Sequence, residues 1–167
     1  CKVTPQMAEE ASKYDSAESF LRAGGLSIET LDNAAFGFTS GDTLILSTSQ
    51  IKIKWNDDLE NVLYEIKYSK LSPIVWAKRV SLETPVEVSY QKSKFFLEDG
   101  HHRYMAAKIL KKKLSAIVEI KDKPIEHLSK LPYDDFIKCV WNQSKHLKEE
   151  INYNEKIHPY DLSVTDL

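Results

Sequence analysis

The chain has 167 residues, of which 42% are hydrophobic and 10% aromatic. This is enough apolar material to form a core, which excludes wholesale disorder, and the length leaves no room for two full catalytic domains. The chain has 23 basic and 25 acidic side chains, so its formal charge is -2. No overall positive field is therefore present to hold a polyanion such as nucleic acid.

The two cysteines, Cys1 and Cys139, are too few and too far apart in sequence to indicate a disulfide framework or a four-ligand zinc site. We therefore predict that Cys139 is an inert thiol and that the protein resides in a reducing, cytoplasmic compartment. The sequence contains no apolar run long enough for a membrane span and does not open on a secretory leader. A start at Cys1 is typical of a truncated sequence or, less commonly, of a lipidated cysteine.

The chain is predicted to begin with a peripheral helix. Apolar residues among Ala, Glu and Lys indicate this helix over 7–23, and the glycines at 24–25 stop it. Small polar residues and two further glycines over 26–42 indicate a packed loop or short pieces of structure. Two β-rich segments follow at 43–47 and 50–55, and the second alternates polar with apolar residues as a half-buried strand does.

A helix is predicted from Asp57 to Tyr68, because apolar residues recur there at helical spacing. Asp57 and Glu60 have the spacing of an acidic capping box. In such a box the first side chain caps the helix, and the second accepts a hydrogen bond from the backbone amide of the capping residue. This pattern places three acidic residues at the start of the helix, since Asp58 lies between them.

The next segment has the pattern of strand, strand, helix, strand. Residues 85–90 and 95–98 are β-rich and flank a short polar connection, which predicts an antiparallel hairpin. A tight turn at 99–100 then leads into a helix that ends in three lysines, and a short apolar strand follows at 114–120. These elements predict an α/β fold of the α+β type, a small mixed sheet with packed helices.

Beyond residue 124 the pattern becomes helical again. A turn or two is expected over 125–131 and a longer amphipathic helix over 136–147, followed by a polar tail from Asn152. The predicted organisation is a helical and loop extension at 1–42, an α/β core at 43–122, and a helical extension with a tail at 123–167.

The most informative feature is the run Asp-Gly-His-His-Arg-Tyr that starts at Asp99. Gly100 permits a tight turn, and the first amides of the following helix lack intrahelical partners and carry the positive end of its dipole. An anion such as phosphate is favoured there, and His101, His102 and Arg103 supply further donors. Asp99 could cap the helix, orient a histidine or hold a divalent cation such as Mg²⁺. An ordinary solvent-facing first turn explains the same residues equally well.

This turn, with the helix and the apolar strand after it, resembles the domain shared by the ParB partition proteins, sulfiredoxin and the free serine kinases. The resemblance covers about 44–120 and is most specific at the turn. It implies a ParB/sulfiredoxin-like fold in which the turn and its helix hold a nucleotide phosphate. The expected ligands are ATP or ADP, or another nucleotide, together with Mg²⁺.

Single residues distinguish the branches of this superfamily. Sulfiredoxin carries Gly-Gly-Cys-His-Arg, and its cysteine is replaced here by His101, which argues against sulfinate repair. The ParB partition proteins carry Gly-Glu-Arg-Arg, which matches Gly100 and Arg103 only, and the segment after Ile120 lacks the glycine-centred turn of a helix-turn-helix module. The free serine kinases carry Asp-Gly-His-His-Arg, the best match.

The kinase resemblance implies a carboxylate base just after the first strand. Asp57, Asp58 and Glu60 occupy that part of this sequence, with Asp where the kinases have Glu. A base must reach the hydroxyl it deprotonates, and Asp is one methylene shorter, so plain N-capping by Asp57 and Asp58 is the preferred interpretation. His101 or His102 is the further catalytic candidate, stabilising charge on the transferred group.

The function predicted best is a nucleotide-phosphate-binding domain, active as a small-molecule kinase or nucleotide hydrolase on a small hydroxyl substrate. One alternative is a ParB-like DNA-binding or nuclease protein, which the net negative charge disfavours. Another is a catalytically degenerate interaction module. No membrane partner is expected.

Overall fold

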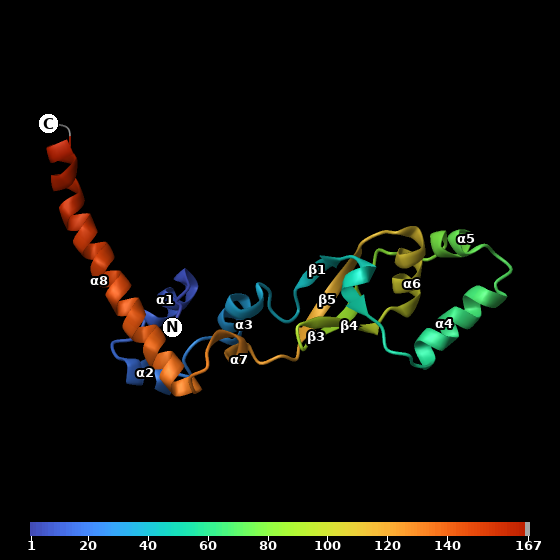
Figure 1. Ribbon diagram of the computed structural model, residues 1–167, viewed down its shortest axis with the longest axis horizontal. Helices are drawn as coiled ribbons and strands as arrows, with labels where there is room; N and C mark the ends of the chain where they lie inside the picture. Colours follow the sequence, from blue (N-terminus) through green and yellow to red (C-terminus); the bar gives the residue numbers. More distant parts are fainter. Residues whose placement is uncertain (166–167) are drawn as a thin grey trace. The chain divides into compact units, whose positions relative to one another are not determined.

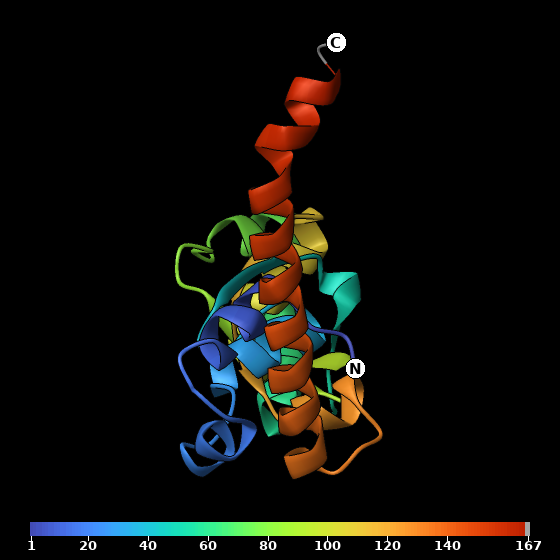
Figure 2. The same cartoon turned by 90° about the vertical axis from the view of Figure 1, so that its left-hand side faces the viewer.

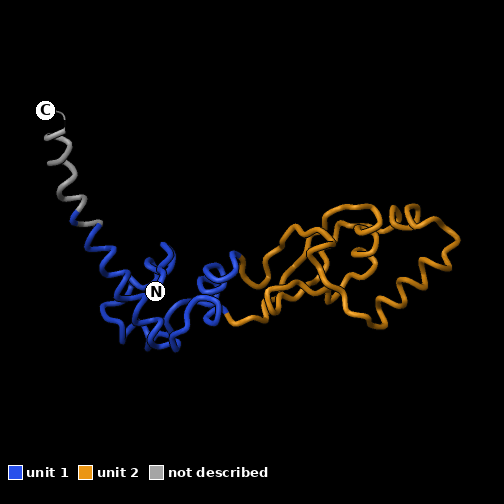
Figure 3. The backbone as a smooth tube through the Cα atoms, in the orientation of Figure 1, with its two compact units in different colours: residues 1–37, 124–167 blue, residues 38–123 orange. Residues whose placement is uncertain are grey.

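The computed structural model describes residues 1–165, with the side chains of residues 1–150 and of Tyr153. The chain forms two compact units (Figure 3). One unit is the segment Phe38–Lys123, and the other combines Cys1–Gly37 with the segment from Pro124 onward. Among the helices that are described, none is both long and apolar enough to cross a membrane.

The unit formed by residues 38–123 is built on a five-stranded mixed sheet (Figure 1). Its strands are β1 (Thr43–Leu46), β2 (Ile51–Lys52), β3 (Val86–Gln91), β4 (Lys94–Asp99) and β5 (Leu114–Ile120). Their order is β1-β5-β3-β4-β2, with β3 parallel to β5, β2 parallel to β4, and the other pairs antiparallel. This mixed sheet with packed helices, and with helices towards both ends of the chain, confirms the predicted fold class.

One face of the sheet carries the core of this unit. Val86 and Val88 alternate with polar residues along β3, as expected for a strand with one buried face. Helix α6 (His101–Leu110) packs against this face through Tyr104 and Ala107. The Tyr104 hydroxyl donates a hydrogen bond to the carbonyl of Thr48 at 3.2 Å, and burial raises the pKa of this phenol.

Two further helices complete the unit. These are α4 (Asp57–Tyr68) and α5 (Pro73–Lys78), and they enclose a second cluster with α6. The bounds of α4 match the prediction, but its cap does not. Asn56, outside the helix, accepts a hydrogen bond from the Leu59 amide at 2.8 Å, so the predicted capping box of Asp57 and Glu60 is wrong. An amide side chain at this position satisfies the free helix amide as well as a carboxylate does.

The strand segments also differ in detail from the prediction. The stretch predicted as a strand over 50–55 holds only the two-residue strand β2. Gln50 belongs to a 3₁₀ turn at Thr48–Gln50, and residues 53–55 have no regular secondary structure. The hairpin between β3 and β4 turns at Lys92 and Ser93, both with positive φ. Both backbone amides donate to the carboxylate of Asp122, which holds this strained turn.

The other unit is helical. It contains α1 (Pro5–Ala11), α2 (Ala17–Arg22), α3 (Ile28–Phe36), α7 (Pro124–Leu128) and α8 (Tyr133–Thr165). Its core is a cluster of apolar side chains from both ends of the chain: Met7, Ala11, Phe20, Leu26, Leu31, Phe136, Ile137 and Val140. The first helices are therefore a structural part of this core, and not peripheral as predicted.

Two predictions for this unit are wrong. The single helix predicted over 7–23 is two helices, because Ser16 caps α2 and pairs reciprocally with Ser19 in a capping box. Of the two alternatives left open for 26–42, the structure has the second, since this stretch contains the short helix α3, which ends where Gly37 takes a left-handed conformation. The polar tail predicted from Asn152 is helical, since α8 continues to Thr165 as one long helix (Figures 1 and 2).

The prediction that Cys139 is an inert free thiol is also wrong. Cys1 and Cys139 form a disulfide with their Cα atoms 6.3 Å apart. The two residues meet because α1 packs on α8, with Met7 and Ala11 in the same core as Phe136. A cytoplasmic location stays a prediction, and an intact disulfide is more typical of proteins in oxidising compartments.

Candidate functional site

The site predicted from the sequence lies where β4 ends and α6 begins. Asp99 is the last residue of β4, and Gly100 follows it as the N-cap of α6 with φ of +100°. A Cβ atom at Gly100 would lie 2.7 Å from Val86 Cγ1. The turn therefore requires glycine for two reasons, a left-handed backbone and close packing against β3.

Helix α6 starts without a side-chain cap, unlike the helices that precede it in the chain. Gly100 offers no side chain to the first amides of α6. Side chains do cap α1 to α5, in the order Thr4, Ser16, Ser27, Asn56 and Ser72. Because the first amides of a helix have no intrahelical acceptor, the start of α6 has donors and a positive dipole end available to an anion.

A surface cavity of about 250 Å³ opens at this helix start. Its lining residues are Asp58, Asn61, Val62, Asp99, Gly100, His101, His102 and Arg103. The fold thus brings the whole Asp-Gly-His-His-Arg run together with Asp58 from α4. Asp57 and Glu60, also predicted as candidate bases, are exposed on the first turn of α4 and do not line this cavity.

His101 is buried, with 4% of its surface exposed, and contacts the residue that caps α4. Its Nε2 atom lies 3.5 Å from Asn56 Nδ2. The Asn56 carbonyl oxygen already accepts from the Leu59 amide, so its NH₂ group faces the imidazole. Nε2 of His101 is then the accepting nitrogen, which places the ring proton on Nδ1.

His102 is held from two sides by residues that sequence reasoning missed. Its Nε2 atom donates to Glu65 Oε2 on α4 at 2.7 Å. Its ring stacks on the indole of Trp76 from α5, with centroids 6.4 Å apart and planes 30° from parallel. Nothing in the local pattern of α4 or α5 distinguishes these two residues, because only the packing of both helices around α6 brings them to His102.

Arg103 is anchored to the chain just before β3. Its Nη1 atom donates to the carbonyl oxygens of Thr84 at 2.9 Å and Pro85 at 2.6 Å. Its Nη2 atom lies 3.7 Å from the carboxylate of Asp99. The guanidinium therefore fixes the start of α6 against β3 and adds positive charge to the wall of the cavity.

The residues present fit a magnesium ion only in company with phosphate. Among the described residues, no group of three or more His, Cys, Asp or Glu side chains is arranged to hold a metal alone. Asp58 and Asp99 both line the cavity, however. One or two carboxylates combined with substrate phosphates and water are the usual ligands of Mg²⁺, so these two carboxylates could complete its shell beside a bound nucleotide.

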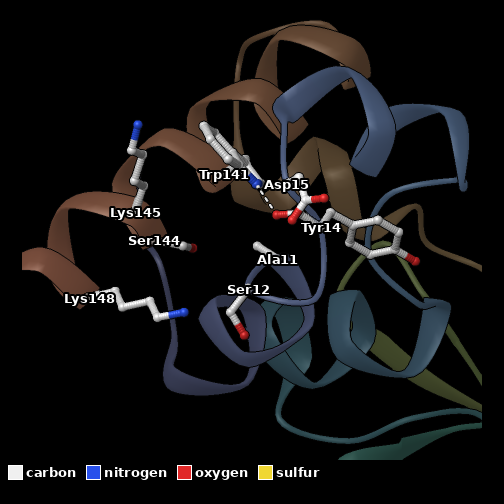
Figure 4. Close-up of a pocket in the computed structure, with 8 residues that line it drawn as sticks. All are labelled: Ala11, Ser12, Tyr14, Asp15, Trp141, Ser144, Lys145 and Lys148. Atoms are coloured by element: carbon white, nitrogen blue, oxygen red, sulfur yellow. Dashed lines mark hydrogen bonds between the residues drawn. The ribbon is translucent and has the colours of Figure 1, made fainter.

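A second cavity lies in the helical unit, between α1 and α8 (Figure 4). Its volume is about 160 Å³, and its lining mixes apolar surface with the basic Lys145 and Lys148 and the acidic Asp15. The Trp141 indole at its edge donates to the carbonyl of Tyr14 at 3.1 Å. None of the predicted site residues lies here, and the mixed charge favours no particular ligand.

Comparisons with known proteins give only distant structural similarity. No protein-family model matches the sequence, and no curated protein matches it significantly. Among solved structures, sulfiredoxin from Arabidopsis thaliana is similar at 17% identity and a TM-score of 0.29, over 53% of this chain and 98% of that one. The chromosome-partitioning protein ParB from Caulobacter crescentus, C-terminally truncated and in complex with CTP-γ-S, is similar at 14% identity and a TM-score of 0.29. That match covers 55% of each chain.

Both neighbours come from families that the turn motif resembles. Identities below 20% and TM-scores of 0.29 are too low to transfer a ligand or an activity. The case for function therefore depends on the residues of the site.

Proposed function

We propose that this protein binds the phosphates of a nucleotide at the start of α6. The observation that carries the proposal is a helix start without a side-chain cap that opens onto a cavity of about 250 Å³ lined by His102 and Arg103. Free amides, a helix dipole and the cationic Arg103 at one point favour a phosphate group. The left-handed Gly100 removes the side chain that would otherwise compete for those amides.

ATP or ADP with Mg²⁺ is the ligand we propose to test first. Asp58 and Asp99 would hold the metal beside the phosphates, where it would neutralise their charge. Without a counter-ion, the two carboxylates would repel a nucleotide, so binding should require Mg²⁺. Transfer of the terminal phosphate to a small hydroxyl compound or to water is the reaction class proposed for this site.

The test is a thermal-shift and calorimetric titration with ATP, ADP, CTP and GTP, each with and without Mg²⁺. A ligand at a hundred times its Kd stabilises a fold by about 2.7 kcal/mol, which is several degrees in Tm. We expect at least one Mg²⁺-nucleotide to give such a shift in the wild type, and a much smaller one in His102→Ala. His102 is half exposed, so its removal should leave the fold intact.

His146→Ala is the matched control, because His146 is an exposed histidine on α8 of the other unit. Its nucleotide response should equal that of the wild type. If no nucleotide moves the Tm at millimolar concentration, the proposed function is wrong, and an interaction module becomes the better interpretation. Steeply salt-dependent binding of DNA instead would favour the nucleic-acid alternative.

A further inference from the structure

The pairing of His102 with Glu65 fixes which nitrogen of the imidazole can react. A carboxylate only accepts hydrogen bonds, so the Nε2 atom, 2.7 Å from Glu65 Oε2, carries a proton. When the ring is neutral, its lone pair is therefore on Nδ1. The ring also stacks on the indole of Trp76, which favours this orientation of the imidazole.

We propose that His102 is the proton acceptor for phosphoryl transfer at this site, and that Glu65 is the residue that positions it. This inference rests on the proposed function, since it requires a bound nucleotide. Asp57 and Glu60 do not line the cavity, whereas His102 does. Asp58 also lines it, but the proposed function assigns that carboxylate to the metal. A carboxylate that orients one nitrogen of a histidine while the other takes a proton is a recurring catalytic arrangement.

The step balances with the groups named. The oxygen of a hydroxyl group, water included, forms a bond to the terminal phosphorus of the nucleotide. The bond from that phosphorus to its bridging oxygen breaks, and the electron pair leaves with the shortened nucleotide. The hydroxyl proton passes to Nδ1 of His102 and then to solvent, while Glu65 stabilises the imidazolium that forms.

Charged groups near His102 come from α4, β4 and α6. Helix α4 contributes Glu65 and also Asp58, β4 contributes Asp99, and α6 itself contributes Arg103. The packed residue from α5 is the uncharged Trp76. Of these groups, Glu65 is the one in direct contact with the imidazole, so its charge should have the largest effect on proton transfer.

The test measures phosphate release from ATP with Mg²⁺ in the full-length protein, as kcat and KM from about pH 5 to pH 8. We expect turnover of the wild type to rise with pH across this range, because the base must be neutral. Glu65→Gln keeps an accepting oxygen but removes the charge, and should lower kcat about tenfold to a hundredfold with KM unchanged. Glu65→Asp should restore part of the loss, and His102→Ala should abolish the pH dependence.

Glu18→Gln, at an exposed glutamate on α2 in the other unit, is the control and should match the wild type. A nucleotide-induced Tm shift, measured on every variant, separates the two proposals. If ATP stabilises the protein but Glu65→Gln keeps full turnover, or no phosphate is released, the inference is overturned and nucleotide binding stands. If ATP gives no stabilisation, the proposed function and this inference both fall.

Discussion

Gly100 is the residue on which the geometry of the site depends most directly. Its φ of +100° is one that residues with a side chain rarely adopt, and a Cβ would meet Val86 Cγ1 at 2.7 Å. In a substitution of Gly100, the positive φ strains the backbone alone, whereas the contact of the new Cβ with Val86 pushes α6 away from β3. The two effects can be separated by substitution.

Gly100→Ala should lower the free energy of unfolding more than a matched glycine substitution elsewhere. Gly41 has φ of +92°, and a Cβ atom added there would meet nothing within 4 Å, so Gly41→Ala reports the backbone cost alone, about 1–2 kcal/mol. Overpacking against Val86 should add about 1–3 kcal/mol in Gly100→Ala. Urea denaturation of both variants measures the difference. Equal losses would mean that β3 and α6 adjust freely at this contact.

The sequence identifies the turn residues but not their partners. Asp99 to Arg103 are contiguous, and glycine followed by basic residues at a helix start has a direct physical meaning for anions. Glu65 and Trp76 belong to helices whose packing against α6 depends on the whole unit. A carboxylate in the middle of an exposed helix looks like any solvated residue until its neighbour is known.

At the scale of elements, α4 and α6 are joined through their N-terminal residues. Asn56 caps α4 with its carbonyl oxygen and reaches His101 at the start of α6 with its amide nitrogen. One side chain therefore serves both helices that form the walls of the cavity. A change to this cap should therefore alter the cavity proposed to bind phosphate.

Asn56→Ala should cost about 1 kcal/mol of stability, as the loss of a helix cap does. It should also weaken nucleotide binding, because His101 loses its contact with α4. Ser72→Ala is the control, since Ser72 caps α5 through the Val75 amide at 3.3 Å. It should cost a similar amount of stability without a change in affinity, as measured by denaturation and calorimetry. An unchanged affinity in Asn56→Ala would show that the contact with His101 has no role in binding.

The elements that the sequence predicts well are those with strong periodicity. The bounds of α4 and the strands of the β3–β4 hairpin follow from apolar spacing and turn residues. The sequence does not distinguish α3 from a loop, because small polar residues and nearby glycines are typical of loops, although Ser27 is a helix cap. The break between α1 and α2 escapes it because Ser16 lies within an otherwise continuous helical pattern.

At the scale of the molecule, the helical unit is assembled from both ends of the chain, and the sheet unit is inserted between them. Sequence patterning cannot show this, because Met7 and Phe136 are far apart in the chain and each is consistent with an ordinary amphipathic helix. The disulfide between Cys1 and Cys139 is hidden from the sequence for the same reason.

Loss of that disulfide should lower stability by about 2–4 kcal/mol, because the bond restricts the unfolded chain. The measurement compares urea denaturation of the wild type, with and without reductant, against a variant carrying Cys1→Ser and Cys139→Ser. Reductant should reduce the stability of the wild type to that of the variant and leave the variant unchanged. Equal stability of all samples would show that the packing of α1 on α8 is sufficient by itself.

The disulfide joins two cysteines that are 138 positions apart in the sequence. The chain from Cys1 to Cys139 is therefore a closed covalent ring, and the entire inserted unit lies within it. A single proteolytic cut within Phe38–Lys123 would open this ring without releasing a fragment. Such a nicked molecule would migrate as one species on a denaturing gel and as two after treatment with a thiol. Limited digestion therefore maps the exposed loops of the inserted unit while both pieces stay covalently attached.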